Sequence, residues 1–81
     1  MPVDSDFFTL PALAWNSPTR YYAAEVRRNL FGDLEFFRAW GGRGSRRGGH
    51  KAEPLSSLEA GRDRLNREDA RRARRGYVRQ T

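Results

Sequence analysis

The residues with the clearest chemical potential in this sequence gather in one short segment rich in glycine and arginine. Five of the eight glycines fall between Gly41 and Gly49, and Glu53 is the one acid near them. Glycines let backbone N–H groups approach a phosphate closely, and guanidinium groups match phosphate oxygens with paired hydrogen bonds. The segment therefore predicts a site for a phosphate-bearing polyanion, with a solvated hairpin loop as the alternative. Its cations are Arg43, Arg46, Arg47 and Lys51.

Trp40 stands immediately before this segment, at the end of an alternating pattern. It shares the alternation with Leu34 and Phe36, so packing in the core is one interpretation. A tryptophan that ends a strand beside a phosphate-binding loop can also stack on a base or a sugar. We therefore take Trp40 and Gly41 as candidate site residues together with the loop, and Arg38 as a supporting cation.

The sequence lacks the parts of most catalytic sites. His50 is the single histidine and there is no cysteine, so dyads and triads built on histidine or a thiol have no members. A zinc site lacks ligands for the same reason. The ten acidic residues are scattered among sixteen cations, which gives no carboxylate pair for acid–base work. We expect a protein that is not an enzyme and that holds no cofactor and no metal ion.

The candidate site must be positioned by the elements around it, and residues 20–40 have the pattern of a β-hairpin. Two runs that alternate with a period of two flank a turn at residues 29–33. Gly32 in this turn can adopt a positive φ. A third strand is expected around residues 50–53, and a short edge strand at residues 77–78.

Residues 55–75 have the pattern of one helix. Ser56 and Glu59 have the spacing of a capping box. Gly76 stands where the residue that follows a helix is often glycine. At 100° per residue the apolar residues form an inward face. That face holds Leu58 and Leu65, with Gly61 and Ala73 on its flanks.

The opposite face of this helix is rich in arginine. Its simplest interpretation is a solvated face with ion pairs four residues apart, Asp63 with Arg67 and Glu68 with Arg72. Its long-range field would still steer a polyanion towards the protein. The face holds Arg64, Arg67, Arg71, Arg74 and Arg75.

Composition sets the size of the fold. The chain has 81 residues, with 16 Lys and Arg against 10 Asp and Glu, which gives a formal net charge of +6. This length suits one small domain. We expect an α+β fold in which a small antiparallel β-sheet of three to four strands packs on one C-terminal α-helix.

The first 19 residues differ from the rest, because they carry two acids and no cation. We expect residues 1–19 to form an N-terminal arm, partly docked on a domain formed by residues 20–79. Phe7, Phe8 and Trp15 give the arm its apolar content. The uncharged stretch that begins at Phe7 has eleven residues, too short to span a bilayer. We expect a cytoplasmic protein that binds no membrane, associated with the nucleoid if the source is bacterial.

The order of several short motifs resembles the WGR domain family, a small module named for a Trp-Gly-Arg signature. The resemblance covers roughly residues 15–79. The similar segments are Asn16 with Arg20-Tyr-Tyr22, Asn29-Leu-Phe-Gly32, Phe37-Arg-Ala-Trp-Gly41 with Gly44-Ser45, Ser57-Leu-Glu-Ala60, and Arg74-Arg-Gly-Tyr77.

The resemblance implies a small antiparallel sheet packed on one helix, and a role at nucleic acid. In the DNA-dependent poly(ADP-ribose) polymerases this module contacts a DNA break. There the signature Trp packs near the terminal sugar, and the signature Arg contacts nucleic acid and neighbouring domains. Similar domains also occur as short stand-alone bacterial proteins. Here the signature reads Trp40-Gly41-Gly42, so either Arg43 takes the role of the missing arginine or the contact specific to ends is weaker.

We therefore expect a non-catalytic nucleic-acid-binding module, with DNA favoured as the partner and a preference for ends or nicks as an option. One alternative is a protein–protein interaction module that uses the aromatic sheet face and the N-terminal arm. A second is an RNA binder of the Gly/Arg type, since Arg47-Gly-Gly49 resembles one such repeat. The sequence leaves the choice between DNA and RNA, and the oligomeric state, open.

Overall fold

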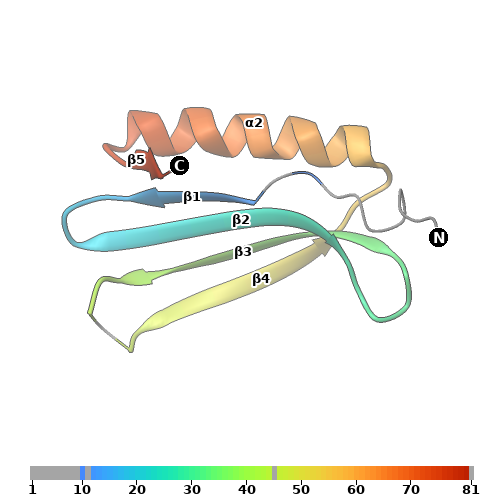
Figure 1. Cartoon of the computed structure of the whole chain (residues 1–81), viewed down its shortest axis with the longest axis horizontal. Coiled ribbons are helices and arrows are strands. Elements are labelled where there is room, and N and C mark those ends of the chain that lie inside the picture. The colour runs from blue at the N-terminus through green and yellow to red at the C-terminus, as the bar shows by residue number, and fades with distance from the viewer. Residues whose placement is uncertain (1–9, 11, 45, 81) are drawn as a thin grey trace.

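A five-stranded antiparallel sheet carries a helix along one of its faces (Figure 1). The computed structural model describes residue 10, residues 12–44 and residues 46–80. The strands lie in the order β4-β3-β2-β1-β5. Their bounds are Leu13–Asn16 for β1, Arg20–Arg28 for β2, Leu34–Gly42 for β3, Gly48–Pro54 for β4 and Val78–Gln80 for β5, and the helix α2 spans Leu58–Arg74.

The predicted hairpin is confirmed and sets the register of the sheet. In β2 and β3, Val26 lies opposite Phe36 and Tyr22 opposite Trp40. The turn is held by Asn29, whose Oδ1 accepts hydrogen bonds from the backbone N–H groups of residues 31 and 33, at 2.9 and 3.0 Å. Gly32 in this turn has a φ of +83°, which a residue with a Cβ adopts at a steric cost.

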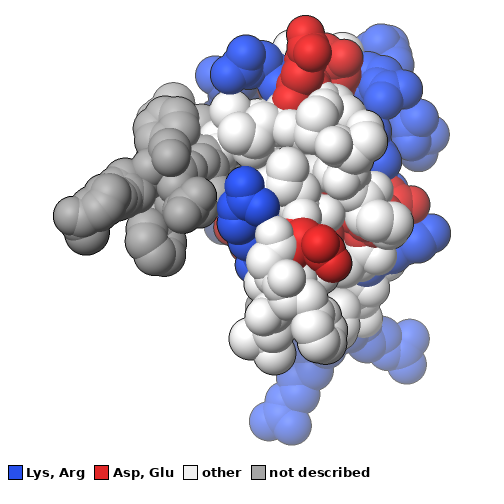
Figure 2. Space-filling model, turned by 90° about the vertical axis from the view of Figure 1, so that its right-hand side faces the viewer, with Lys and Arg blue, Asp and Glu red and all other residues white. Residues whose placement is uncertain are grey.

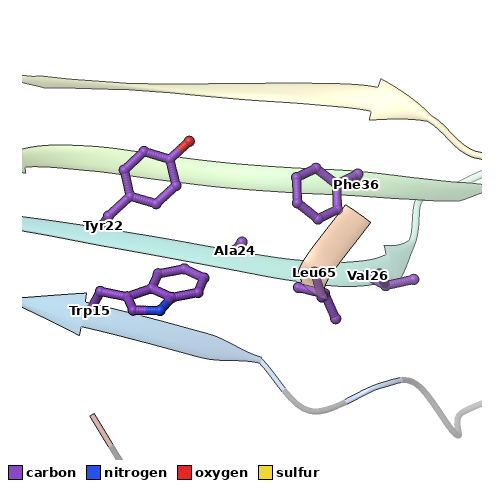
Figure 3. Close-up of a cluster of buried hydrophobic side chains, with 6 residues drawn as sticks. All are labelled: Trp15, Tyr22, Ala24, Val26, Phe36 and Leu65. Atoms are coloured by element: carbon purple, nitrogen blue, oxygen red, sulfur yellow. The ribbon is translucent and has the colours of Figure 1, made fainter. Parts of the chain in front are cut away.

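The core lies between the sheet and α2 (Figure 3). Alternation along β2 turns every second residue towards the helix, and β1, β3 and α2 complete the cluster. The indole of Trp15 is 1% exposed, and its Nε1–H donates to Asp69 Oδ1 of α2 at 2.9 Å. A polar group that is buried without such a partner would be costly. The buried apolar residues are Trp15, Tyr22, Ala24, Val26, Phe36 and Leu65.

The sheet has five strands, so the expectation of three to four was wrong. The α+β class and the C-terminal helix are confirmed. The additional strand is β1, which lies inside the segment expected as an arm and pairs with both β2 and β5. The burial of Trp15 explains why this segment forms a strand, because β1 places the indole against Tyr22 with ring centroids 5.8 Å apart. The expected docking of Phe7 and Phe8 lies outside the described residues.

The helix begins one residue later than its expected capping box. Ser57, not Ser56, is the N-cap, and its Oγ accepts from the backbone N–H of Ala60 at 3.0 Å. The chain stays bound to the sheet until just before this point, since the N–H of Leu55 donates to the carbonyl of Leu34. The end of the helix at Gly76 is confirmed, and its N–H donates to the Ala73 carbonyl.

The inward face of α2 is less apolar than expected. Gly61 and Leu65 are buried as predicted, but Ala73 is exposed, and Glu68 and Arg72 are buried instead. The expected Glu68–Arg72 pair does form, at 3.6 Å, but against the sheet rather than in solvent. Beneath the C-terminal half of α2 the sheet presents the ring of Tyr22, on which the Arg72 guanidinium lies, and Arg38, which pairs with the Glu68 carboxylate. These partners suit charged side chains better than a methyl group. The described helix is neither long nor apolar enough to cross a membrane.

Candidate nucleic-acid interface

Trp40 lies at the end of the sheet where β3 enters the glycine-rich loop. Its ring stacks on Tyr22, with centroids 6.1 Å apart and planes 19° apart. On its other flank a Cβ at Gly49 would come within 2.9 Å of the indole, so glycine is needed for this close approach. Trp40 is 37% exposed although it shares the face of the buried core. The ring is therefore fixed in place and still accessible to a ligand.

A hollow of about 350 Å³ opens beside this ring. Three guanidinium-bearing residues from three elements line it, Arg20 of β2, Arg47 of the loop and Arg72 of α2. Tyr22, Trp40 and Tyr77 supply its aromatic surface. Cations beside aromatic rings suit a ligand that has both negative charge and flat or sugar-like surfaces.

Arg72 is the cation that is fixed most firmly at this hollow. Its Cζ lies 4.2 Å from the ring centroid of Tyr22 and 5.3 Å from that of Tyr77. Its Nε is buried, and no hydrogen-bond partner is present in the described part of the chain. Glu68 stands 3.6 Å away, close enough to balance charge but not to accept a good hydrogen bond.

Arg20 lies across the sheet from Gly42, the position at which the Trp-Gly-Arg signature has its arginine. Gly42 is the direct partner of Arg20 across β2 and β3, so the Arg20 side chain starts on the same face of the sheet. Arg43 is held elsewhere, because its backbone N–H donates to the carbonyl of Thr19 at 2.8 Å and its Nη1 lies 3.4 Å from the carbonyl of Ser17. Arg20, rather than Arg43, lines the hollow beside Trp40.

A second group of charges lies between β4 and α2 and is largely self-compensated. Glu53 accepts from Arg64 Nη2 at 2.7 Å and lies within 4.0 Å of both Lys51 and Arg38. The hydrogen bond from Arg64 holds the pKa of Glu53 below its usual value. The Tyr22 hydroxyl, 3.5 Å from Arg38 Nη1, raises the pKa of that arginine, and Glu53 and Glu68 add to the effect.

The structure divides the predicted site residues between four places. Trp40, Gly41 and Arg47 line the hollow, whereas Arg46 is exposed in the loop and Arg43 is tied to the preceding turn. Arg38 and Lys51 belong to the ionic group around the Glu53 carboxylate.

Among the residues of the hollow that the sequence analysis did not propose, Arg20, Arg72 and Tyr77 matter most for its chemistry. Arg20 could have been found, because it stands two residues before Tyr22 on the same side of the strand. Arg72 and Tyr77 reach the hollow only through the packing of α2 on the sheet, which no local pattern indicates. Within residues 10, 12–44 and 46–80, no three acidic or histidine side chains come together as ligands of a metal ion would.

A helix-covered antiparallel sheet that holds an exposed tryptophan among arginines is an arrangement typical of small modules that bind nucleic acid. The sequence model of the WGR domain matches residues 14–81. The chain therefore belongs to the WGR domain family, which is consistent with nucleic-acid binding in general. No curated protein and no solved structure matches this chain.

Proposed function

We propose that this chain is a non-catalytic module that binds nucleic acid, with DNA preferred, through the hollow beside Trp40 and the adjoining loop. One observation carries the proposal: an accessible indole is clamped between Tyr22 and Gly49 beside three converging arginines. The preference for DNA rests on the resemblance to the module that contacts DNA breaks in poly(ADP-ribose) polymerases.

Electrostatic attraction supplies most of the affinity in this proposal. Arg20, Arg46 and Arg47 lie at one end of the sheet, apart from the ionic group around Glu53. Cations of this kind release counterions from a phosphate backbone, so affinity falls as salt rises. These contacts position the duplex but carry no information about its sequence.

Trp40 supplies a preference for strand ends or nicks. A terminal sugar or base can lie flat on an exposed indole, whereas an intact duplex keeps its bases stacked on one another. The Arg20 guanidinium beside Gly42 provides the charge that the signature arginine provides elsewhere in the family. We expect a modest preference for nicked or blunt-ended DNA over closed circular DNA, of about tenfold or less, where tenfold is 1.4 kcal/mol.

A titration with matched DNA forms tests the proposal. Closed circular, nicked and linear forms of one plasmid differ only in their ends, so a competition assay reports the preference directly. The Arg47→Gln variant should weaken binding to all forms, and the Arg62→Gln variant, changed at an exposed site near the other end of α2, should not. Equal and weak binding of all forms, unchanged by Arg47→Gln, would contradict the proposal.

A protein-binding role is the second candidate, and one observation favours it. Tyr22 and Phe36 are buried beneath α2, so these two rings are not accessible to a partner protein. Leu30 and Phe31 at the β2–β3 turn, however, are 101% and 86% exposed. A rigid apolar tip fits a partner protein with an apolar recess. Changing both residues to Ser should leave DNA affinity unchanged and abolish any such partner contact.

A further inference from the structure

The arginines of α2 differ in their partners, and one of them, Arg62, is exposed near the N-terminal end of the helix. Arg64 and Arg72 are bound to the acids of the sheet–helix interface. Arg67, Arg71 and Arg74 are exposed, and none has an acidic group within 4.0 Å in the described part of the chain. The expected solvent pair of Asp63 with Arg67 is therefore not formed. We call Arg67, Arg71 and Arg74 the arginine row.

The arginine row lies on the side of α2 that faces the β4 edge of the sheet. Its members follow Arg64 at steps of three, four and three residues, which places them along one side of a helix. Arg64 reaches Glu53 of β4, so this side faces β4. Asp69, on the other side, bonds to Trp15 of β1 and lies 3.4 Å from Arg79 of β5.

The row also lies at the same end of the molecule as the candidate site. Contacts along α2 run in step with β3: Arg64 lies over Phe36, Glu68 beside Arg38, and Arg72 in the hollow lined by Trp40. The later members of the row are therefore level with Trp40. In Figure 1 the C-terminal end of α2 and the β3–β4 loop lie at the same end. Figure 2, viewed from the opposite end, shows a mainly uncharged centre with cations around its margin.

We infer that the arginine row is a second phosphate-binding surface, which takes the sugar-phosphate backbone of the DNA whose end or nick lies at Trp40. This inference rests on the proposed function. From Arg67 to Arg74 the row advances seven steps along the helix, or about 10 Å at 1.5 Å per residue. One strand of DNA advances 3.4 Å per nucleotide along the helix axis, so the row matches about three successive phosphates.

A purely structural role does not account for the whole row. Arginine in the last turn of a helix offsets the negative end of the helix dipole, and this applies to Arg71 and Arg74. The effect falls off within the last turn. Arg67 stands two turns before the end of α2. The dipole therefore leaves the charge of Arg67 unexplained, and what separates Arg67 from the equally exposed Arg62 is its place in a row with Arg71 and Arg74 beside the candidate site.

Charge-matched double variants test the inference by fluorescence anisotropy with a 20-base-pair nicked duplex at several salt concentrations. Arg67→Gln with Arg71→Gln removes two members of the row. Arg28→Gln with Arg62→Gln removes the same charge from exposed positions at the other end. Glutamine has nearly the helix propensity of arginine, so the three substitutions in α2 should leave the melting temperature close to that of the native protein. Arg28 lies in β2 and donates to the Gly32 carbonyl at 2.7 Å, so the melting temperature of the control is measured as well.

We expect the row variant to lose about tenfold or more in affinity and to flatten the salt dependence by about 1.8, at about 0.9 per phosphate. The matched variant should lose less than twofold. Equal losses of affinity in the two variants would overturn the inference. A row variant with a lower melting temperature and unchanged affinity would also overturn it, because the row would then act on the helix dipole and not on DNA. Arg46→Gln with Arg47→Gln separates the two proposals: if this loop variant weakens binding and the row variant does not, only the row is wrong. If the loop variant and the native protein bind alike, the proposed function fails.

Discussion

At the scale of single residues, the pairing of Arg20 with Gly42 distinguishes the candidate site of this chain from the Trp-Gly-Arg signature. The two residues face each other across β2 and β3, and Arg20 lines the hollow beside Trp40. A charge-assisted hydrogen bond contributes about 1.5–3 kcal/mol when it is well formed. We therefore expect the location of the guanidinium to matter more than whether it belongs to residue 20 or to residue 42.

This exchange predicts a rescue. Arg20→Gln should lower the ratio of affinities for nicked over closed circular DNA from its native value, at most tenfold, towards one. Gly42→Arg added to Arg20→Gln should restore the ratio, because it returns a guanidinium to the same face from the opposite strand. Competition between the two plasmid forms measures the ratio. Arg43→Gln is the control and should leave it unchanged, since Arg43 is held at the Ser17 carbonyl. No rescue would refute the equivalence of the two positions.

The hydrogen bond between Trp15 and Asp69 makes a second residue-scale prediction, on stability. Asp69→Ala leaves the buried indole N–H of Trp15 without its acceptor. An unpaired buried donor costs about 1–3 kcal/mol. Urea unfolding should show a loss in that range. Asp63→Ala, an exposed change on the same helix, should cost less than about 0.5 kcal/mol. Similar losses in the two variants would remove this bond as a determinant of stability.

At the scale of elements, the contact of β4 with α2 depends on charge. Arg64, Lys51 and Arg38 surround Glu53, and the hydrogen bond from Arg64 lowers the pKa of Glu53 below its usual 4.5. A carboxylate whose pKa is lower in the folded protein stabilises the fold above its unfolded-state pKa. That stabilisation is lost as the pH falls through the folded-state value.

The lowered pKa of Glu53 gives a prediction for the pH dependence of stability. Between pH 7 and about pH 3 the native protein should lose stability, and Glu53→Gln should lose less over the same range while being less stable at pH 7. Urea midpoints at a series of pH values measure both effects. Glu59→Gln, at an exposed position in the first turn of α2, is the control and should follow the native curve. A Glu53→Gln curve parallel to the native one would contradict the assignment.

The elements that sequence reasoning found are those with local signals. The β2–β3 hairpin has alternation on both sides of Gly32, and the helix ends at Gly76, so both were predictable. The strand β1 was missed because four residues give no clear alternation and its partners in β5 lie more than 60 positions away. The burial of Glu68 and Arg72 was missed because charged residues in a helical pattern normally face solvent.

The candidate site, like the fold, was predictable where its residues lie close together in the sequence. Trp40 and the loop cations are adjacent in sequence, so their type and spacing indicated a phosphate-binding surface. The hollow is assembled from β2, the loop and α2, and its depth depends on tertiary packing. That packing also separates Arg47, which lines the hollow, from Lys51, which is paired with Glu53.

At the scale of the whole molecule, the charge is distributed unevenly along the sheet. The loop, the hollow and the arginine row lie at one end, and the apolar tip of Leu30 and Phe31 lies at the other. An uneven field of this kind orients the molecule as it approaches a polyanion. The exposed end with Trp40 is therefore expected to meet the DNA first.

Salt dependence measures how many phosphates this end engages. If the loop and the hollow neutralise four to five phosphates, log K against log salt should have a slope near −4, at about 0.9 per phosphate. With the three phosphates of the arginine row engaged as well, the slope should steepen to about −7. Titrations of a duplex between about 50 and 200 mM salt give the value. A slope near zero would rule out electrostatic docking.

The two tryptophans of this chain allow the most direct test of the central claim, that Trp40 contacts the DNA. Trp15 is 1% exposed in the core and Trp40 is 37% exposed at the hollow, so their indole N–H signals report one buried and one accessible ring within the same molecule. We predict that a nicked duplex added to the ¹⁵N-labelled protein shifts or broadens the Trp40 signal and leaves the Trp15 signal in place. If binding occurs and both indole signals stay unchanged, the DNA lies elsewhere on the molecule, and the account of the site is wrong.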